Sequence, residues 1–407
     1  MLKVLRILNR FNLGGPTYNA TYLTKYMSPE FTTLLVGGIN DSSEKNSEYI
    51  ANQLGVEPIT IPSMRRELSP LNDLKAYSQI RNIIRDFRPD IVHTHASKAG
   101  ALGRQAAINL NVPVIVHTFH GHVFDSYFSN AKANLYKTIE RKLAKKSSGI
   151  IAISDKQKDE IANKHRICES DKIKVIPLGF ELNQFTENMD FKRFEFRDKY
   201  RIKDDEIAIG IIGRLVPIKN HEMFLESLKK LMNKSSKKIK AFIVGDGEMR
   251  DYLKTKASRL GLEHISVNGY VPPNDANVTF TSWISEIDMV NAGMDIIALS
   301  SLNEGTPVSL IEAQAANKPI VTTAVGGIEN VILPNETALI SNNNSEDFAE
   351  KLLQLVENKD LRKKLSTKGW NHVSYKYHYK RLIDEMTDYY YEMLDKSRVP
   401  YKMPVAV

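Results

Sequence analysis

The sequence predicts an α/β fold made of two doubly wound domains, each with a parallel sheet covered by helices. Short β-rich runs alternate with helical stretches along almost the whole chain of 407 residues, as they do in parallel α/β proteins. These runs lack a polar face, which is typical of parallel strands buried between two layers of helices. The runs are too many for one compact sheet, and the chain is long enough for two domains. We expect the two domains to face a cleft.

The first half of the chain contains seven predicted strands. They are residues 3–8, 33–36, 58–61, 91–93, 114–118, 150–153 and 174–176. Before the fourth strand, an apolar stripe from Leu74 to Phe87 predicts a helix that ends at Arg88 and Pro89, because the residue before a proline disfavours helical backbone.

The second half repeats the pattern with predicted strands at 207–212, 240–244, 296–299, 320–323 and 338–340. Residues 182–205 are highly charged and poor in aliphatic side chains, so we place the domain boundary there. The predicted domains are 1–182 and 183–376. Residues 377–407 form a tyrosine-rich helix and tail, which we expect to cross back to the first domain.

The composition is that of a soluble protein, with 42% apolar and 26% charged residues. No apolar run is long enough to span a bilayer, and the N-terminus lacks a signal-peptide cleavage site and predicts a strand. The single cysteine, Cys168, excludes an internal disulfide and fits a reducing compartment. A net charge of +8 favours anionic partners and leaves nucleic acid, acidic lipid and nucleotide phosphates open.

Basic residues gather in the segment from Ser129 to Lys146. Six lysines and arginines accompany one acidic residue, Glu140, in a segment whose apolar residues recur every four positions, which predicts a helix. One interpretation is the solvated face of a packed helix. The other is a patch that rests on an anionic membrane surface.

The stretch NEGTPVSLIEA places Glu304 and Glu312 around a predicted helix start. Thr306 suits the N-cap and Pro307 the first helical position, while Gly305 permits a sharp turn. The first N–H groups of such a helix form a site for an anion. Two carboxylates would repel a phosphate, so we expect them to accept hydrogen bonds from hydroxyl groups beside it.

Two further loops follow predicted strands and contain ligand-binding chemistry. Arg214 and Lys219 stand five positions apart and suit a diphosphate that must be held and neutralised; the alternative is that both are ordinary surface charges. Gly14 and Gly15 follow the first strand and bring bare backbone and a helix start to the same edge, although Gly-Gly-Pro is also a common turn. In open α/β sheets, ligands bind beyond the carboxyl ends of the strands.

Five histidines, His93, His95, His117, His120 and His122, lie at or just past the ends of two predicted strands. Two His-x-His spacings raise a zinc hypothesis, since alternate residues share one face of a strand. Because no cysteine and few carboxylates accompany them, we favour a polar cluster in which one histidine contacts a sugar.

Taken in order, these features resemble the retaining nucleotide-sugar glycosyltransferases of the GT-B architecture, family 4, which have two Rossmann-like domains. Glu304 and Glu312 match the E-x7-E motif of that family, and residues 213–220 are similar to its GR…K-N/G diphosphate loop. Gly14 and Gly15 resemble its amino-terminal glycine loop, and His120 falls where the family often has a histidine. The resemblance runs from residue 13 to about 327, nearly the whole chain.

The resemblance implies a role for each of these residues. Arg214 and Lys219 would hold the donor diphosphate and stabilise the leaving group. Glu312 would bind the ribose, Glu304 the transferred sugar, and His120 the sugar from the opposite domain once the cleft closes. The implied catalytic residues are Glu304, His120, Arg214 and Lys219. The implied donor-binding residues are Gly14, Gly15, Arg214, Lys219, Gly305, Thr306, Pro307, Val308 and Glu312.

The same resemblance implies a UDP-sugar donor, with GDP as the rival base, and no essential metal or other cofactor. It implies a cytoplasmic enzyme that extends a lipid-linked glycan or surface polysaccharide precursor, without a nucleic-acid partner. The expectation that the enzyme works at the inner face of the plasma membrane rests on the basic segment from Ser129 to Lys146. Two departures stand out. Residues 178–181 read LGFE where the family has Asn-Gly-Val/Ile-Asp, and residues 268–282 are extra in the region that binds the base.

Two other functions remain open at this point. An epimerase of the same architecture would need acids placed for proton abstraction at the sugar C2, and the sequence does not identify them. A catalytically silent nucleotide-sugar binder would have less need for the leaving-group cations Arg214 and Lys219.

Overall fold

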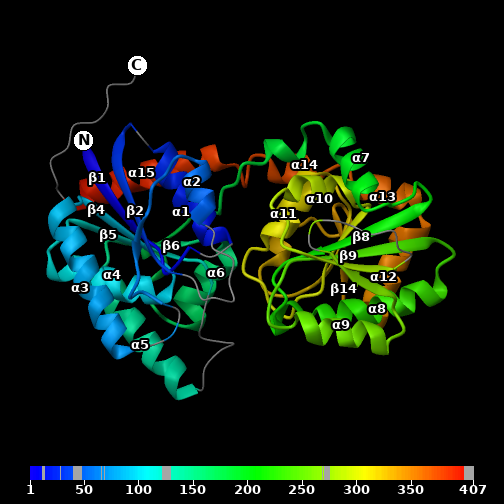
Figure 1. Cartoon of the computed structure of the whole chain (residues 1–407). Helices are drawn as coiled ribbons and strands as arrows, with labels where there is room; N and C mark the ends of the chain where they lie inside the picture. The colour runs from blue at the N-terminus through cyan, green and yellow to red at the C-terminus, as the bar shows by residue number, and fades with distance from the viewer. Residues whose placement is uncertain are drawn as a thin grey trace. The chain divides into compact units, whose positions relative to one another are not determined.

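A computed structural model describes residues 1–11, 14–27, 29–39, 48–65, 67, 69–121, 130–267, 269 and 276–397, without the side chains of 48–49 and 130–132. The chain forms two compact units (Figure 1). The first contains Met1–Phe180 and Tyr377–Val407, and the second contains Glu181–Lys376. Within the described residues, no helix combines the length and apolarity that crossing a bilayer requires.

The first unit is built on a parallel sheet of seven strands in the order β3-β2-β1-β4-β5-β6-β7. The strands are β1 (Leu2–Ile7), β2 (Phe31–Gly38), β3 (Ile59–Ile61), β4 (Ile91–His95), β5 (Val114–Phe119), β6 (Gly149–Ala152) and β7 (Ile173–Val175). The strand order reverses between β1 and β4, which makes their carboxyl ends the switch point where such sheets bind ligands. All seven predicted strands of this half are present, within two residues at most boundaries.

The helices of the first unit connect these strands. They are α1 (Gly15–Tyr26), α2 (Glu48–Gln53), α3 (Pro70–Phe87), α4 (Ser97–Asn109), α5 (Asn130–Lys146) and α6 (Asp155–Asp159), which continues into a π-helical turn, η1 (Glu160–Lys164). Helix α3 is present as predicted, and Ala76, Ile80 and Ile84 are buried against the sheet. Leu74, where the predicted apolar stripe begins, is 66% exposed. The helix ends at Arg88 in left-handed backbone, because Pro89 cannot continue it.

The last helix, α15 (Tyr379–Ser397), packs in the first unit, and in Figure 1 it lies among the amino-terminal elements. Its buried residues Leu382, Met386 and Tyr390 share a core with Val4 and Ile91 of the central strands. A chain that leaves the first unit at Phe180 therefore returns to it at Tyr377 and completes its core.

The second unit has its own parallel sheet of seven strands, in the order β10-β11-β9-β8-β12-β13-β14. The strands are β8 (Glu206–Ile212), β9 (Lys238–Val244), β10 (His264–Ser266), β11 (Val278–Ser282), β12 (Ile296–Leu299), β13 (Ile320–Thr323) and β14 (Ala338–Ser341). Strands β10 and β11 were not predicted from the sequence. Strand β10 has only three residues, and β11 alternates apolar residues with threonine, so both lack the apolar run by which the other strands were predicted.

The helices of the second unit are α7 (Met189–Lys199), α8 (His221–Lys234), α9 (Arg250–Arg259), α10 (Ile287–Gly293), α11 (Val308–Ala315), α12 (Ser345–Glu357), α13 (Lys359–Leu365) and α14 (Gly369–Val373). Helix α7 lies in the charged segment at the boundary and is anchored by arginines. Arg193 and Arg197 form ion pairs with Asp295 at 2.7 and 3.2 Å and donate to backbone carbonyls at the end of α10. Cations at a helix C-terminus complement its partial negative charge.

Candidate active site

The candidate donor site lies at the carboxyl ends of β8 and β12, the two strands between which the order of the second sheet reverses. The loop after β8 contains Arg214 and Lys219, and the loop after β12 contains Glu304. Backbone contacts join the loops: Leu302 N–H donates to the Ile218 carbonyl at 2.8 Å, and the Ser300 hydroxyl donates to the Asn220 carbonyl at 2.9 Å. Parallel pairing of β8 and β12 therefore brings together two segments far apart in the sequence.

Lys219 and Glu304 form an ion pair across these loops. The Lys219 Nζ lies 2.5 Å from Glu304 Oε1, and the Ser301 hydroxyl donates to the same oxygen at 2.6 Å. The side chains are only 20% and 9% exposed, so water screens the pair weakly. The ammonium has three protons, and those not held by Glu304 are available to another anion.

Two glycines after β13 support the backbone of Glu304. Gly327 N–H donates to the Glu304 carbonyl at 2.8 Å. A Cβ at Gly326 would lie 1.9 Å from that carbonyl oxygen, and one at Gly327 would lie 2.0 Å from the Gly305 oxygen. Gly326 also has a φ of +57°, in the left-handed region that favours glycine. Larger residues at either position would displace the turn that holds Glu304.

The helix after this turn begins one residue later than predicted. Helix α11 starts at Val308, and Pro307 occupies the N-cap with extended backbone, so the prediction of Thr306 as the N-cap was wrong. No side-chain hydrogen bond caps the helix. The N–H groups of Val308 and Ser309 donate to no acceptor in the described part of the chain. They are therefore available to an anion at this helix start.

Glu312 lies on α11, just over one turn past its start, and is half-buried. Burial, helped by the nearby carboxylate of Asp288, raises the pKa of Glu312 to about 8. Its carboxyl group has no hydrogen-bond or ion-pair partner among the described residues. Partial burial and the charge of Asp288 disfavour the ionised form, so Glu312 keeps its proton at neutral pH until a donor of hydrogen bonds stabilises the carboxylate.

Arg214 follows β8 on the same loop as Lys219, with an exposed side chain. The turn after β9 packs closely against this loop: Leu215 N–H donates to the Asp246 carbonyl at 2.9 Å, and a Cβ at Gly245 would lie 2.0 Å from the Gly213 oxygen. The turn at 244–248 thus supports the loop of Arg214 and Lys219.

The predicted residues of the first unit lie at the carboxyl ends of its own strands. Gly14 occupies the N-cap of α1 and Gly15 begins that helix. His120 follows β5, and its Nε2 lies 2.9 Å from Nδ1 of His95 at the end of β4. Burial lowers the pKa of His120 to about 3, so its ring is neutral. The remaining ring nitrogens, His95 Nε2 and His120 Nδ1, make no hydrogen bond among the described residues.

The other histidines have structural partners. His93 bonds to Tyr390 of α15 at 2.6 Å and to Thr118 at 2.7 Å, and His117 bonds to Thr94 at 2.9 Å. His122 lies outside the described residues. Over the described ranges, no group of three or more His, Cys, Asp or Glu side chains is arranged to hold a metal ion.

Sequence reasoning missed two contributors to these sites. Ser301 hydrogen-bonds Glu304, and Asp288 raises the pKa of Glu312. Ser301 stands just past the end of β12, which was a usable signal. Asp288 had none, because only the packing of α10 near α11 brings it to Glu312.

Two doubly wound parallel sheets, each with candidate ligand loops at the carboxyl ends of its strands, define a protein of the GT-B class. Solved structures show the same fold. Anabaena Alr3699/HepE, solved in complex with UDP, superposes with a TM-score of 0.77 at 17% identity over 96% of this chain and 100% of its own. A glycosyltransferase from Rickettsia africae superposes with a TM-score of 0.75 at 21% identity, over 97% of this chain and 98% of its own.

The family follows from the sequence comparisons. The model for Glycosyltransferase Family 4 matches residues 32–184, and the model for Glycosyl transferases group 1 matches residues 192–372. The chain belongs to this family of glycosyltransferases. An Escherichia coli UDP-Gal:alpha-D-GlcNAc-diphosphoundecaprenol alpha-1,3-galactosyltransferase is 29% identical over 83% of this chain and 84% of its own. Staphylococcus aureus CapM, a capsular polysaccharide biosynthesis glycosyltransferase, is 24% identical over 82% and 85%.

Proposed function

We propose that this glycosyltransferase moves a sugar from a UDP-sugar to a lipid-linked glycan or surface polysaccharide precursor, with retention of anomeric configuration. The observation that carries the proposal is the Lys219–Glu304 pair beside the open start of α11. The cation and the free N–H groups suit a diphosphate, and the carboxylate beside them suits sugar hydroxyls, which supports the proposal. The named donor and acceptor of the E. coli relative favour UDP over GDP and a lipid-diphosphate acceptor.

In this proposal each residue has one task. Lys219 and Arg214 neutralise the charge that grows on the leaving diphosphate, and the N–H groups at the start of α11 add to this stabilisation. Glu304 orients the transferred sugar, and Glu312 accepts hydrogen bonds from the ribose. His120 contacts the sugar through its free ring nitrogen. We also propose that the two cations make a metal unnecessary, which a full rate of transfer in the presence of EDTA would support.

The test uses purified full-length protein and a panel of UDP- and GDP-sugars. We expect one UDP-sugar to raise the melting temperature and to be hydrolysed slowly to UDP. Transfer to a lipid extract should give a product whose anomeric configuration, read by NMR, equals that of the donor; an inverted product would refute retention. An isomerised nucleotide sugar without UDP release would indicate the epimerase, and binding without turnover would indicate a silent binder.

We propose further that the enzyme works in the cytoplasm and rests on the inner face of the plasma membrane through α5. Leu135, Ile139, Lys142 and Lys146 follow one another at helical spacing, and all four side chains are exposed. The two apolar residues are 60% and 37% exposed, although the sequence pattern grouped them with Leu143, which is buried. An exposed row of apolar and basic residues suits the surface of an anionic bilayer.

Reversing the charge of two residues in this row tests the membrane contact. The double variant Lys142→Glu and Lys146→Glu should bind vesicles that contain phosphatidylglycerol at least about tenfold more weakly, since each basic residue near such a surface contributes about 1 kcal/mol. The matched control reverses Lys363 and Lys364, which are exposed on α13 of the second unit. Equal binding by both double variants and the unaltered protein would leave α5 as a solvated helix face.

A further inference from the structure

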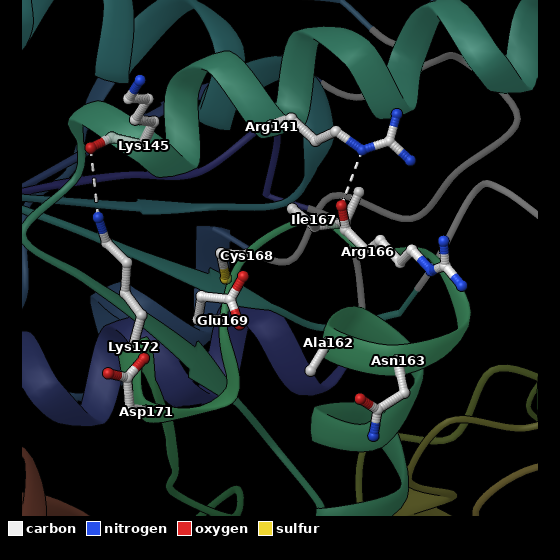
Figure 2. A pocket seen from close by; sticks show the side chains of 10 residues that line it. All are labelled: Arg141, Lys145, Ala162, Asn163, Arg166, Ile167, Cys168, Glu169, Asp171 and Lys172. Carbon is white, nitrogen blue, oxygen red and sulfur yellow. Dashed lines mark hydrogen bonds between the residues drawn. The ribbon is translucent and has the colours of Figure 1, made fainter.

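A cavity lies in the first unit, between α5 and the segment that leads from η1 to β7 (Figure 2). Its volume is about 860 Å³, within the usual size of ligand pockets. Its lining, which we call the basic pocket, consists of Arg141, Lys145, Ala162, Asn163, Arg166, Ile167, Cys168, Glu169, Asp171 and Lys172.

The basic pocket is separate from the histidines at the carboxyl ends of β4 and β5. Asp171 and Lys172 directly precede β7, and Lys145 lies shortly before β6, so this part of the pocket adjoins the amino ends of both strands. His95 and His120 lie at the opposite ends of their strands in the same parallel sheet. None of the roles proposed for sugar transfer uses a residue of this pocket.

The charge of the pocket favours an anion. Four cations line it against two carboxylates, Glu169 and Asp171. Among the described residues, none of the six forms an ion pair. Cations that share a concave surface without carboxylate partners create a positive potential that attracts an anion.

Contacts with backbone carbonyls hold two of these cations in place. Arg141 donates from Nε to the Arg166 carbonyl at 2.7 Å and from Nη2 to the His165 carbonyl at 2.8 Å, and Figure 2 shows the first of these bonds. Lys172 Nζ donates to the Lys145 carbonyl at 3.3 Å, which joins the two walls of the pocket. A guanidinium fixed in this way loses less freedom when it binds an anion.

The backbone of this wall is unusual. Residues Glu160–Lys164 form a π-helical turn, in which His165 N–H donates to the Glu160 carbonyl at 2.8 Å. Arg166 follows in left-handed backbone with a φ of +51°, which places its carbonyl at Arg141. π-Helical turns and left-handed residues other than glycine occur frequently at functional sites.

We propose that the basic pocket binds a phosphate group, carried either by the head group of an anionic lipid or by a soluble phosphate ester. Cations stand on both walls, Arg141 and Lys145 on α5 and Arg166 and Lys172 opposite. The tetrahedral oxygens of a phosphate can meet both walls, and arginine binds phosphate with two parallel hydrogen bonds. This inference is independent of the sugar-transfer proposal, because no residue proposed to act in sugar transfer lines the pocket.

The experiment compares two probes on the full-length protein: glycerol 3-phosphate by calorimetry, and phosphatidylcholine vesicles with and without phosphatidic acid. We expect saturable binding of at least one probe, weakened at least tenfold by Arg166→Gln and by Lys145→Gln. The control Lys174→Gln removes an exposed charge on β7, outside the pocket lining, and should keep affinity within twofold. Melting temperatures close to that of the unaltered protein establish that the variants fold.

Cys168 reports where the probe binds, because it lines the pocket and is the single cysteine of the chain. A bound phosphate ester should slow its alkylation by iodoacetamide, followed by mass spectrometry. Binding and protection by both probes identify the phosphate itself as the ligand, and effects with vesicles alone identify a lipid head group. The proposal is overturned if neither probe binds, if the control weakens binding as much as the pocket variants, or if Cys168 is not protected.

Discussion

Replacement of Lys219 by alanine should lower the rate of sugar transfer by about 10²–10³-fold, the usual cost of removing one group that stabilises a developing negative charge. The Lys219 side chain is only 20% exposed, so its charge acts on a leaving diphosphate with little screening by water. The loss should appear mainly in kcat, because the charge on the diphosphate grows as the glycosidic bond breaks. The loss in kcat is measured as the rate of UDP release at a saturating concentration of the best UDP-sugar.

The control for this variant is Lys230→Ala on α8. Lys230 also forms an ion pair at 2.5 Å, with Glu346, but its side chain is 38% exposed and that of Glu346 is 62% exposed. Exposed pairs contribute little, so this variant should keep its activity and stability. Because Lys219→Ala leaves Glu304 without its cation, a melting curve must accompany the assay. Full activity in a folded Lys219→Ala protein would remove the proposed leaving-group role.

Substitutions of the two glutamates should affect different steps, turnover for Glu304 and nucleotide binding for Glu312. Glu304→Gln should lower kcat by about tenfold or more with little change in nucleotide affinity, because Glu304 is proposed to hold the transferred sugar. Glu312→Gln should weaken the binding of UDP and UDP-sugar and leave kcat at saturation closer to that of the unaltered enzyme. Calorimetry and initial rates give both quantities, with Glu350→Gln, an exposed carboxylate on α12, as the control. If instead Glu304→Gln weakens nucleotide binding and Glu312→Gln lowers kcat, the roles proposed for the two glutamates are exchanged.

Glu312 also predicts how nucleotide binding depends on pH. Its pKa of about 8 means that a carboxylate which accepts bonds from the ribose must first lose a proton. Affinity for a UDP-sugar should therefore rise by up to about tenfold per pH unit below pH 8 and become constant above it. The Glu312→Gln variant should show no such rise, and a rise that persists in this variant would place the titrating group elsewhere.

The raised pKa of Glu312 also makes the stability of the folded protein depend on pH. The folded state holds the Glu312 proton up to about pH 8, whereas the unfolded chain loses it near its ordinary pKa of 4.5. Between these values the folded state binds more protons, so the contribution of Glu312 to stability is largest at low pH and is lost as pH rises towards 8.

Much of the fold was predictable because parallel α/β proteins have a strong local signal. Apolar β-rich runs identified twelve of the strands, and the stripe on α3 together with Pro89 identified that helix and its end. The short, polar strand β10 was not predicted, because it is a strand only through its pairing with β11. The start of α11 was placed one residue early, since the sequence allows Pro307 either in the helix or just before it and only the backbone chooses.

The candidate site, too, was predictable only in part. The sequence by itself determined the chemical inventory: an arginine and a lysine after one strand, two glutamates around a helix start, and histidines at two strand ends. Tertiary structure alone decided which of them meet. Lys219 and Glu304 are 85 residues apart and touch because β8 and β12 are neighbours in the sheet. Likewise, the pairing of β4 with β5 brings His95 to His120, and burial near Asp288 sets the protonation of Glu312. Contacts and desolvation depend on distance in space, which a linear pattern of residues does not contain.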